Sequence, residues 1–413
     1  MAIQIEKAKL IESLKKVMPG VETGNTVIDG TDLLLFTGAS VSSYNSEIAV
    51  SAPCDTQNVS FSVKGADFFN LVSRMSDVMV SLEIVDNKVK LKAGRTKASM
   101  TLEDSSKVMN LIRDLNVASL KYEAIPEAFI DAVNICNLSG NAENIRGVAV
   151  NDYEDGSAVY ETDSTRVCIN KLPERMVPFW VDDTTFNNAF KVGTPTGYCV
   201  SDAWLHLKYA DGTVFSAKRK DHTAYPFEAL ASFPKAFENA KVIVKGRLPN
   251  NIAEAVSRVA ILASGVDKKN ARLVRMTFRK DELELYAEKM GGEASETIPW
   301  ETALEEDPQD MEVWVNTSFL LEASNKVMDF TLCYMDMDPT APPSLSLVFQ
   351  SGEFMQFVQG ATNSKCRRGD RRPPCGRHDD HRHYRRDRLR EDDGADGARV
   401  ARRADPRLRR DLP

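Results

Sequence analysis

Histidine and cysteine, two side chains that often act in catalysis and metal binding, are few in this sequence. Neither they nor the acidic runs have the spacing that a catalytic or metal site requires. Residues 1–365 contain two histidines, His206 and His222. His206 falls in an alternating strand pattern and His222 in a charged loop, so neither is predicted to be a general base. The acidic run 305–307 lies in a proline-containing loop, and the run around Asp336 lacks the glycine and terminal glutamate of a calcium loop. We expect solvated carboxylates in both runs.

The cysteines and the known short motifs support the same expectation. Glycine-rich phosphate loops, dinucleotide-binding loops, nucleophile elbows and H-E-x-x-H zinc motifs do not occur in the sequence. No pair of cysteines has C-x-x-C spacing, and none of the cysteines in residues 1–365 has a histidine partner nearby. We therefore expect no catalytic residues, no metal site and no cofactor, and a reducing cytoplasm is the expected location. The seven cysteines are at positions 54, 136, 168, 199, 333, 366 and 375.

Length and composition are those of a water-soluble globular protein. The 413 residues are enough for two to four domains, and 42% hydrophobic with 27% charged residues is ordinary. The formal net charge of −7 argues against a protein that coats nucleic acid through bulk charge. No apolar run approaches the roughly 18 residues of a membrane span, and we expect no signal segment at the N-terminus.

The chain changes character near residue 365. Residues 366–413 contain 16 Arg, no Lys and 10 acidic residues, a net charge of +6, which leaves −13 for residues 1–365. This tail also has no Ile, Phe, Trp or Met, so it is predicted to be disordered because it cannot bury enough apolar surface. An arginine-rich nucleic-acid arm is the alternative. The abrupt switch from lysine to arginine favours an unstructured extension, such as a reading frame entered by a frameshift.

Residues 1–365 are predicted to repeat one plan three times. Each third opens with a short strand and a helix that has apolar residues at helical spacing, and the strand–helix pair recurs midway through the third. Each second helix is followed by period-2 strands that turn at Asp86-Asn87, Asp211-Gly212 or Ser351-Gly352. Such turns predict hairpins and antiparallel sheets. The expected fold class is α+β, with helices on one sheet face and the other face or the sheet edges open. The predicted opening helices are 7–18, 126–138 and 249–263, and the later ones are 66–75, 184–190 and 317–328.

Several segments resemble the bacterial DNA sliding clamp, the beta subunit of DNA polymerase III, in order along residues 1–365. In the first third these are Phe68-Phe69-Asn70-Leu71 and Lys92-Ala93-Gly94-Arg95. In the second third, the segment 161–167 (E-T-D-S-T-R-V) resembles the family's T-D-G-H-R-L, and the segment 225–228 (Y-P-F-E) resembles its F-P-D-Y. In the last third, R-V-A-I-L at 258–262 and R-L-V-R at 272–275 resemble R-A-A-I-L and R-G-V-R-L.

The resemblance implies three clamp domains, 1–119, 120–240 and 241–365, followed by the tail. It implies a head-to-tail homodimer that closes into a ring around double-stranded DNA and tethers the replicative polymerase, as a non-catalytic processivity factor in DNA replication. A ring holds DNA topologically and needs few phosphate contacts, which is compatible with the negative charge. The DNA-binding candidates that follow from the resemblance are Lys9, Lys16, Arg74, Arg146, Arg258, Lys268, Lys269, Arg272 and Lys326.

The resemblance also implies a pocket between the second and third domains that binds short peptides of the polymerase and the clamp loader. Its expected wall is Thr162, Ser164, Arg166, Val167, Pro226, Leu230 and Val358.

The sequence departs from the family at several of these places. The family's Gly-His in the pocket segment is Ser164-Thr165, and the two tyrosines that follow its strand arginine are Gly147-Val148. The family's terminal M-P-M-R-L is replaced by Phe357 to Ala361 and then the tail. Such divergence would suit a phage-encoded clamp. Two alternatives remain open: a β-rich assembly protein that oligomerises through its sheet edges without DNA, and an enzyme whose site is too diffuse to recognise in a sequence.

Overall fold

The computed structural model describes residues 2–24, 27–138, 145–263, 272–289, 291–302, 304, 306–337 and 340–360. These residues belong to one compact unit, Met1–Asn363. Lys268, Lys269 and the predicted tail 366–413 lie outside the described residues. No helix in the described ranges is long and apolar enough to cross a membrane.

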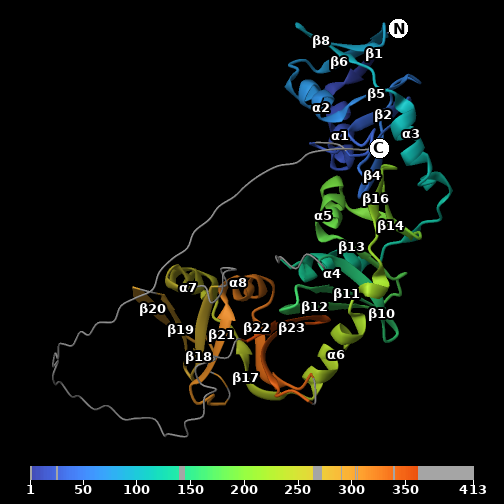
Figure 1. Ribbon diagram of the computed structural model, residues 1–413. Coiled ribbons are helices and arrows are strands. Elements are labelled where there is room, and N and C mark those ends of the chain that lie inside the picture. The colour runs from blue at the N-terminus through green and yellow to red at the C-terminus, as the bar shows by residue number, and fades with distance from the viewer. Residues whose placement is uncertain are drawn as a thin grey trace, which may run out of the picture. The chain divides into compact units, whose positions relative to one another are not determined.

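The chain is built from six successive units, each a strand, a helix and three further strands (Figure 1). The first two units are β1 (Ala2–Glu6), α1 (Lys7–Val17), β2 (Leu33–Thr37), β3 (Ser40–Tyr44) and β4 (Ile48–Pro53), then β5 (Ser60–Lys64), α2 (Gly65–Arg74), β6 (Met79–Val85), β7 (Lys88–Ala93) and β8 (Thr96–Thr101). The next two are β9 (Glu123–Ala124), α4 (Glu127–Cys136), β10 (Val148–Tyr153), β11 (Gly156–Thr162) and β12 (Arg166–Leu172), then β13 (Phe179–Val181), α5 (Asp183–Val192), β14 (Pro195–Val200), β15 (Trp204–Tyr209) and β16 (Val214–Lys218). The last two are β17 (Lys241–Arg247), α7 (Ile252–Val259), β18 (Leu273–Phe278), β19 (Glu282–Lys289) and β20 (Gly292–Pro299), then β21 (Met311–Asn316), α8 (Thr317–Lys326), β22 (Asp329–Met335), β23 (Ser344–Ser351) and β24 (Phe354–Gln359).

The described strands form four antiparallel sheets, two of which contain strands from successive thirds of the sequence. The N-terminal sheet has the order β1-β6-β7-β8, and the C-terminal sheet has the order β20-β19-β18-β21. The first central sheet, β5-β2-β3-β4-β16-β15-β14-β9, is continuous through the pairing of β4 with β16. The second central sheet, β13-β10-β11-β12-β24-β23-β22-β17, is continuous through the pairing of β12 with β24. The predicted α+β fold with antiparallel sheets is confirmed.

The apolar patterns in the sequence explain which face of each element is buried. In α1, Leu10, Leu14 and Val17 are buried and lie on one helical face. In β7, the lysines are exposed and alternate with buried Val89 and Leu91. The core-facing sides of all four sheets and the six unit helices share one continuous apolar core. Burial of each leucine or valine side chain stabilises the fold by roughly 1.5–3 kcal/mol before its entropy loss is counted.

Two further helices connect the thirds, and the sequence analysis did not predict either. Helix α3 (Ser105–Arg113) begins after Asp104, whose carboxylate accepts a hydrogen bond from the Ser106 N–H at 2.9 Å. Helix α6 (Phe227–Glu238) contains Pro234. Each packs on the sheet face opposite the unit helices: α3 on β2, and α6 on the second central sheet. The six unit helices lie on one face of the sheets, as expected. The two connecting helices, α3 and α6, lie on the opposite face, which corrects the expectation that all helices share one face.

Candidate functional site

The turn between β11 and β12 places polar side chains at the boundary between the second and third repeats. The Thr162 hydroxyl donates to the Arg166 carbonyl at 2.6 Å, and Asp163 Oδ1 accepts from the backbone N–H groups of Thr165 and Arg166 at 3.0 and 2.7 Å. Ser164 has a φ of +72°, in the left-handed region. These bonds hold a tight turn that leaves Ser164 and Thr165 exposed.

A cavity of about 340 Å³, here called the α6 pocket, opens beside this turn. Its walls come from the turn, α6, the loop between β22 and β23, and strands β12, β23 and β24. Phe233 on α6 packs against Phe357 on β24 with ring centroids 5.2 Å apart. Among the described residues that line it, none is charged, so this part of the pocket suits an apolar side chain with hydroxyl and amide groups at the rim. The lining residues are Ser164, Thr165, Val167, Phe233, Met337, Ala341, Pro342, Ser344, Ser346, Phe357 and Gln359.

Two of the seven predicted wall residues, Ser164 and Val167, line this pocket. Leu230 is buried between α6 and the sheet, and Pro226 immediately precedes α6. Thr162, Arg166 and Val358 are buried and do not line it. The peptide-binding role of the set stays a prediction. The residues missed by sequence analysis include Phe233, whose spacing from Leu230 and Phe237 is a helical signal.

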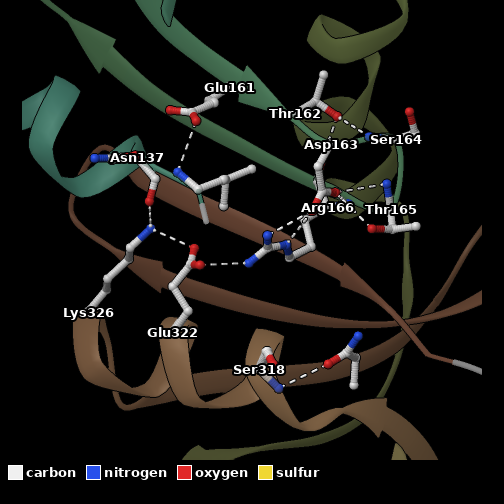
Figure 2. Close-up of polar contacts among 12 residues, drawn as sticks. Asn137, Glu161, Thr162, Asp163, Ser164, Thr165, Arg166, Ser318, Glu322 and Lys326 are labelled. Atoms are coloured by element: carbon white, nitrogen blue, oxygen red, sulfur yellow. Dashed lines mark hydrogen bonds and ion pairs between the residues drawn. The ribbon is translucent and has the colours of Figure 1, made fainter. Parts of the chain in front are cut away.

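Arg166 is the centre of a buried polar network that connects three elements (Figure 2). Its side chain is 0% exposed. Two guanidinium nitrogens, Nε and one terminal nitrogen, donate to Asp163 Oδ2 at 2.9 and 2.7 Å, and the other terminal nitrogen is 2.9 Å from Glu322 Oε2 on α8. The guanidinium carbon also lies 3.9 Å from the ring centroid of Phe319. Burial alone would raise the pKa of Asp163. The charge of Arg166 and the hydrogen bonds to Asp163 outweigh this effect and hold its pKa below the usual value.

Lys326 extends the same network to the end of α4. Its Nζ donates to Glu322 Oε1 at 3.2 Å and to the Asn137 carbonyl at 2.6 Å, and its side chain is 14% exposed. The family resemblance made Lys326 a DNA-binding candidate, and the structure places its side chain in this internal contact. Because Arg166 belongs to the second repeat and Glu322 and Lys326 to the third, the network joins the repeats beside the β12–β24 pairing.

Glu161 is a buried carboxyl next to this network. Its Oε1 accepts a hydrogen bond from the Leu138 N–H at 3.0 Å, whereas Oε2 has no hydrogen-bond partner among the described residues. Burial raises the pKa of Glu161 to about 8, with further increases from Asp183 and Glu322 and an opposing effect from Lys326. Glu161 is therefore mostly protonated at neutral pH. The buried thiols of Cys136 and Cys168 also lie near it.

The DNA-binding candidates in the described ranges differ in how many carboxylates of the protein each of them contacts. Arg74 and Arg272 are exposed and have no ion pair there. Lys9 is exposed and pairs with Glu6 at 3.2 Å. Lys16 contacts two carboxylates, Glu12 and Asp211, both at 2.8 Å.

Two further arginine candidates also have carboxylate partners. Arg146 lies 2.5 Å from the buried carboxylate of Asp183, and Arg258 pairs with Glu296 at 2.6 Å and Glu254 at 3.6 Å. A DNA role for any candidate stays a prediction.

Gly147 follows Arg146 at the point where the resembling family has a tyrosine. Its φ is +137°. A Cβ atom built there would lie 2.2 Å from the Val181 carbonyl oxygen and 2.8 Å from Trp180 Nε1. The close approach of β13 therefore requires glycine at this position.

The histidine and two of the cysteines considered in the sequence are buried side chains. His206 is a buried sheet residue as predicted, and its ring nitrogens lie 3.1 and 2.8 Å from the hydroxyls of Ser201 and Ser216. Burial lowers the pKa of His206 to about 4. Burial also raises the pKa of the Cys54 and Cys333 thiols to about 11. No group of three or more His, Cys, Asp or Glu residues in the described ranges is placed to bind a metal ion.

Comparison with solved structures identifies the fold. The DNA polymerase III beta chain of Streptococcus pneumoniae superimposes with a TM-score of 0.71 at 13% identity, covering 88% of this chain and 100% of that one. The DNA polymerase sliding clamp of Bacillus subtilis gives 0.69 at 14% identity, covering 88% and 99%. A Helicobacter pylori beta clamp bound to a DNA ligase peptide gives 0.66 at 15% identity, covering 88% and 100%. No protein-family model and no curated protein matches the sequence. The chain thus has the fold of the bacterial beta clamps, with a divergent sequence.

We expect Arg166 and Glu322 to be strongly coupled in stability. Arg166→Leu or Glu322→Leu alone should lower the free energy of unfolding by up to roughly 3–5 kcal/mol, because each leaves a buried charge with one partner fewer: Arg166 keeps Asp163, and Glu322 keeps Lys326. The loss of unfolding free energy in the double variant should be smaller than the sum of the losses in the two single variants, by at least about 1 kcal/mol. Urea unfolding of the four proteins measures the coupling. The exposed pair Arg247→Leu and Asp329→Leu is the control, with an expected coupling below about 1 kcal/mol. Additive losses at Arg166 and Glu322 would contradict an energetic connection.

Glu161 should make the protein less stable as the pH rises. Its folded-state pKa of about 8 exceeds the roughly 4.3 of an unfolded chain, so between these values the folded state retains a proton that the unfolded state has lost. The stabilisation that Glu161 contributes is complete below the unfolded-state pKa. It then decreases by roughly 1.4 kcal/mol per pH unit as the pH rises to about 8. Glu161→Gln should flatten the dependence seen in urea unfolding between these limits. The exposed Glu174→Gln is the matched control, and equal slopes in both variants would refute the assignment.

Proposed function

We propose that this protein is a DNA sliding clamp, in which two copies close head to tail into a ring around double-stranded DNA. The observation that carries the proposal is the pairing pattern of the repeated units. Inside the chain, the last strand of a first unit pairs with the last strand of a second unit, as β4 does with β16 and β12 with β24. Strands β20 and β8 are the corresponding strands that have no such partner, and each is the edge of a four-stranded sheet.

Two copies would satisfy both open edges at once. If β20 of each copy pairs with β8 of the other, both four-stranded sheets become parts of eight-stranded sheets like the two central sheets. Open edges otherwise leave backbone N–H and C=O groups available for uncontrolled pairing. The two interfaces are equivalent and the assembly is closed, as expected for a symmetric dimer.

The proposed ring explains how an acidic protein could be retained on DNA. A groove-binding protein must neutralise several phosphates, whereas a closed ring is released only when it opens or reaches a DNA end. Exposed Arg74 and Arg272 are the candidates best placed for transient phosphate contacts, because neither is engaged by a carboxylate in the described ranges. In this function the protein is a non-catalytic subunit located in the cytoplasm, and polymerase activity resides in its partner.

The α6 pocket is the proposed site for the polymerase and the clamp loader. The described part of its lining is uncharged and partly aromatic, which fits apolar side chains of a short peptide, and its rim hydroxyls can bond to a peptide backbone. One clamp of the same fold is bound to a DNA ligase peptide, which supports peptide recognition as the mode of partner binding.

Retention on DNA should depend on DNA topology. Incubation with linear duplex, followed by enzymatic circularisation, should trap rings that have threaded onto the DNA. The trapped protein should then co-elute with the circles in gel filtration at about 0.5 M NaCl, a concentration that strips most groove-binding proteins. A single cut in the circle should release it, because the ring can slide off an end. Equal retention on cut and uncut DNA would reject topological binding.

A charge at the mouth of the α6 pocket should weaken peptide binding. Ala341 lines the pocket and is exposed, so Ala341→Glu should leave stability nearly unchanged. It should reduce affinity for an apolar peptide by at least about tenfold, because the carboxylate loses hydration when the peptide covers it. Fluorescence anisotropy with hexapeptides that differ in their apolar residues provides the measurement. Exposed Ala203→Glu, away from the pocket, is the control. Equal affinities of the two variants would place the peptide site elsewhere.

A further inference from the structure

Strand β17 is an open edge of the second central sheet, where it pairs only with β22 among the described strands (Figure 1). It has seven residues, whereas β13 at the other edge of this sheet has three, all of them buried. The register between β17 and β22 shifts between Val242 and Val244, so the first half of β17 is irregular. Because a bulge hinders pairing with a further strand, the regular half from Val244 to Arg247 is the part of the edge that can accept one.

The regular half of β17 directs backbone groups outward. Just after the strand, the N–H of Leu248 donates to the carbonyl of Met328 at 2.9 Å. Hydrogen-bonded and non-hydrogen-bonded pairs alternate along antiparallel strands, so the N–H and C=O groups of Lys245 and Arg247 point away from β22. Within the described ranges these groups form no hydrogen bond. They are therefore available to the backbone of an added strand.

A cavity of about 780 Å³, here called the β17 groove, adjoins these groups. Its walls come from residues 245–248, the start of β22, the turn between β23 and β24, and residues 301, 302 and 304 after β20. Its apolar floor consists of Leu248, Leu304 and Phe330, which are buried. Gly246 lies against this floor, since a Cβ atom there would be 2.7 Å from a methyl carbon of Leu304. The volume is within the range of ligand sites in proteins, roughly 300–1,000 Å³.

The side chains around the groove indicate the chemistry of its ligand. Lys245 is exposed and has no ion pair in the described part of the chain, whereas Arg247 pairs with Asp329 at 3.3 Å. Successive side chains of a strand face opposite sides, so Lys245 and Arg247 share one side and Gly246 faces the other, where the apolar floor lies. A strand added beside β17 would match both sides with an acidic residue opposite Lys245 and an apolar residue opposite Gly246.

We propose that the β17 groove binds an extended peptide segment of a protein partner, in which acidic and apolar residues alternate, as an added antiparallel strand of the second central sheet. This inference goes beyond the proposed ring and does not depend on it. Strand addition supplies affinity through main-chain hydrogen bonds and specificity through alternate side chains. A second copy of β17 fits the edge less well, because it would bring Lys245 and Arg247 close to the same residues of the other copy.

The β17 groove and the α6 pocket lie at opposite ends of the same strands. The groove is lined by Asp329 at the start of β22 and Ser351 at the end of β23. The α6 pocket is lined by Ser344 at the start of β23 and Gln359 at the end of β24. Strands β22 and β23 have seven and eight residues, and a strand of this length spans roughly 20 Å. A short peptide therefore cannot fill both sites, and a peptide in the α6 pocket leaves the groove open.

Labelled hexapeptides and the full chain test the proposal. The peptide T-E-V-E-V-T should bind in fluorescence anisotropy, and T-K-V-K-V-T should bind at least about tenfold more weakly, because its lysines would lie opposite Lys245 and Arg247. Methylation of the backbone nitrogens of the two E residues removes donors to β17 and should weaken binding at least about tenfold. The same methylation at the two V residues affects N–H groups that face away from β17, so it should change the affinity less than about threefold.

One substitution in β17 and a matched control locate the binding site. Lys245→Glu should weaken binding of T-E-V-E-V-T by at least about tenfold and strengthen binding of T-K-V-K-V-T. Lys241→Glu makes the same change at an exposed lysine before the bulge and should alter either affinity less than about threefold. Ala341→Glu, at the mouth of the α6 pocket, should leave both affinities unchanged. Both lysines are exposed, so the urea midpoints of their variants should match that of the unmodified chain.

The outcomes identify the site and its occupant. Equal effects of methylation at the E and V residues would refute strand addition, and equal effects of Lys245→Glu and Lys241→Glu would refute the groove. Loss of binding in Ala341→Glu would place the peptide in the α6 pocket, and absence of binding at about 1 mM peptide would overturn the proposal outright. If Lys245→Glu lowered the association state of the chain in sedimentation, a second copy would occupy the edge and the peptide would be refuted. The ring is tested separately, by retention on circular DNA.

Discussion

The structure depends on one constraint: the backbone of the last strand in each unit needs a hydrogen-bonded neighbour. Within the chain this need is met across repeat boundaries, where β4 pairs with β16 and β12 with β24. The repeats are consequently connected by continuous sheets as well as by the helices α3 and α6. A connection of this kind fixes the register of two repeats residue by residue, because a shift by one position would turn every side chain to the opposite face.

The polar network around Arg166 is placed where that constraint acts. It lies on the core-facing side of the β12–β24 pairing and connects β12 to α8 and α4. On the opposite side of the same strands is the apolar packing of α6 and the α6 pocket. One sheet thus has a charged connection on one face and the packing of α6 with its pocket on the other. A ligand in the pocket would contact the turn at Ser164 and Thr165, next to Asp163, which holds Arg166.

Much of the fold was predictable because it follows local periodicity. The helices beginning at Lys7 and Thr317 and the hairpin at Asp86-Asn87, where both residues have positive φ, appear where the patterns placed them. The pocket was less predictable, since motif resemblance does not show which way a side chain points. Arg166 and Val167 are adjacent on a strand and must face opposite sides of the sheet, so both could not line one pocket. The role of Lys326 was also hidden, because its backbone partner Asn137 is distant in sequence.

The tight contact at Gly147 has a consequence for how this sequence can change over generations. A tyrosine cannot enter this position by a single substitution, because its Cβ would overlap the Val181 carbonyl before the ring found any space. Strand β13 would have to move first, and such a move would disturb its pairing with β10. Any larger residue at position 147 is therefore reached only through a less stable intermediate. Arg146 cannot be replaced freely either while Asp183 remains buried against it, so two neighbouring positions of this segment are held fixed by β13 and α5.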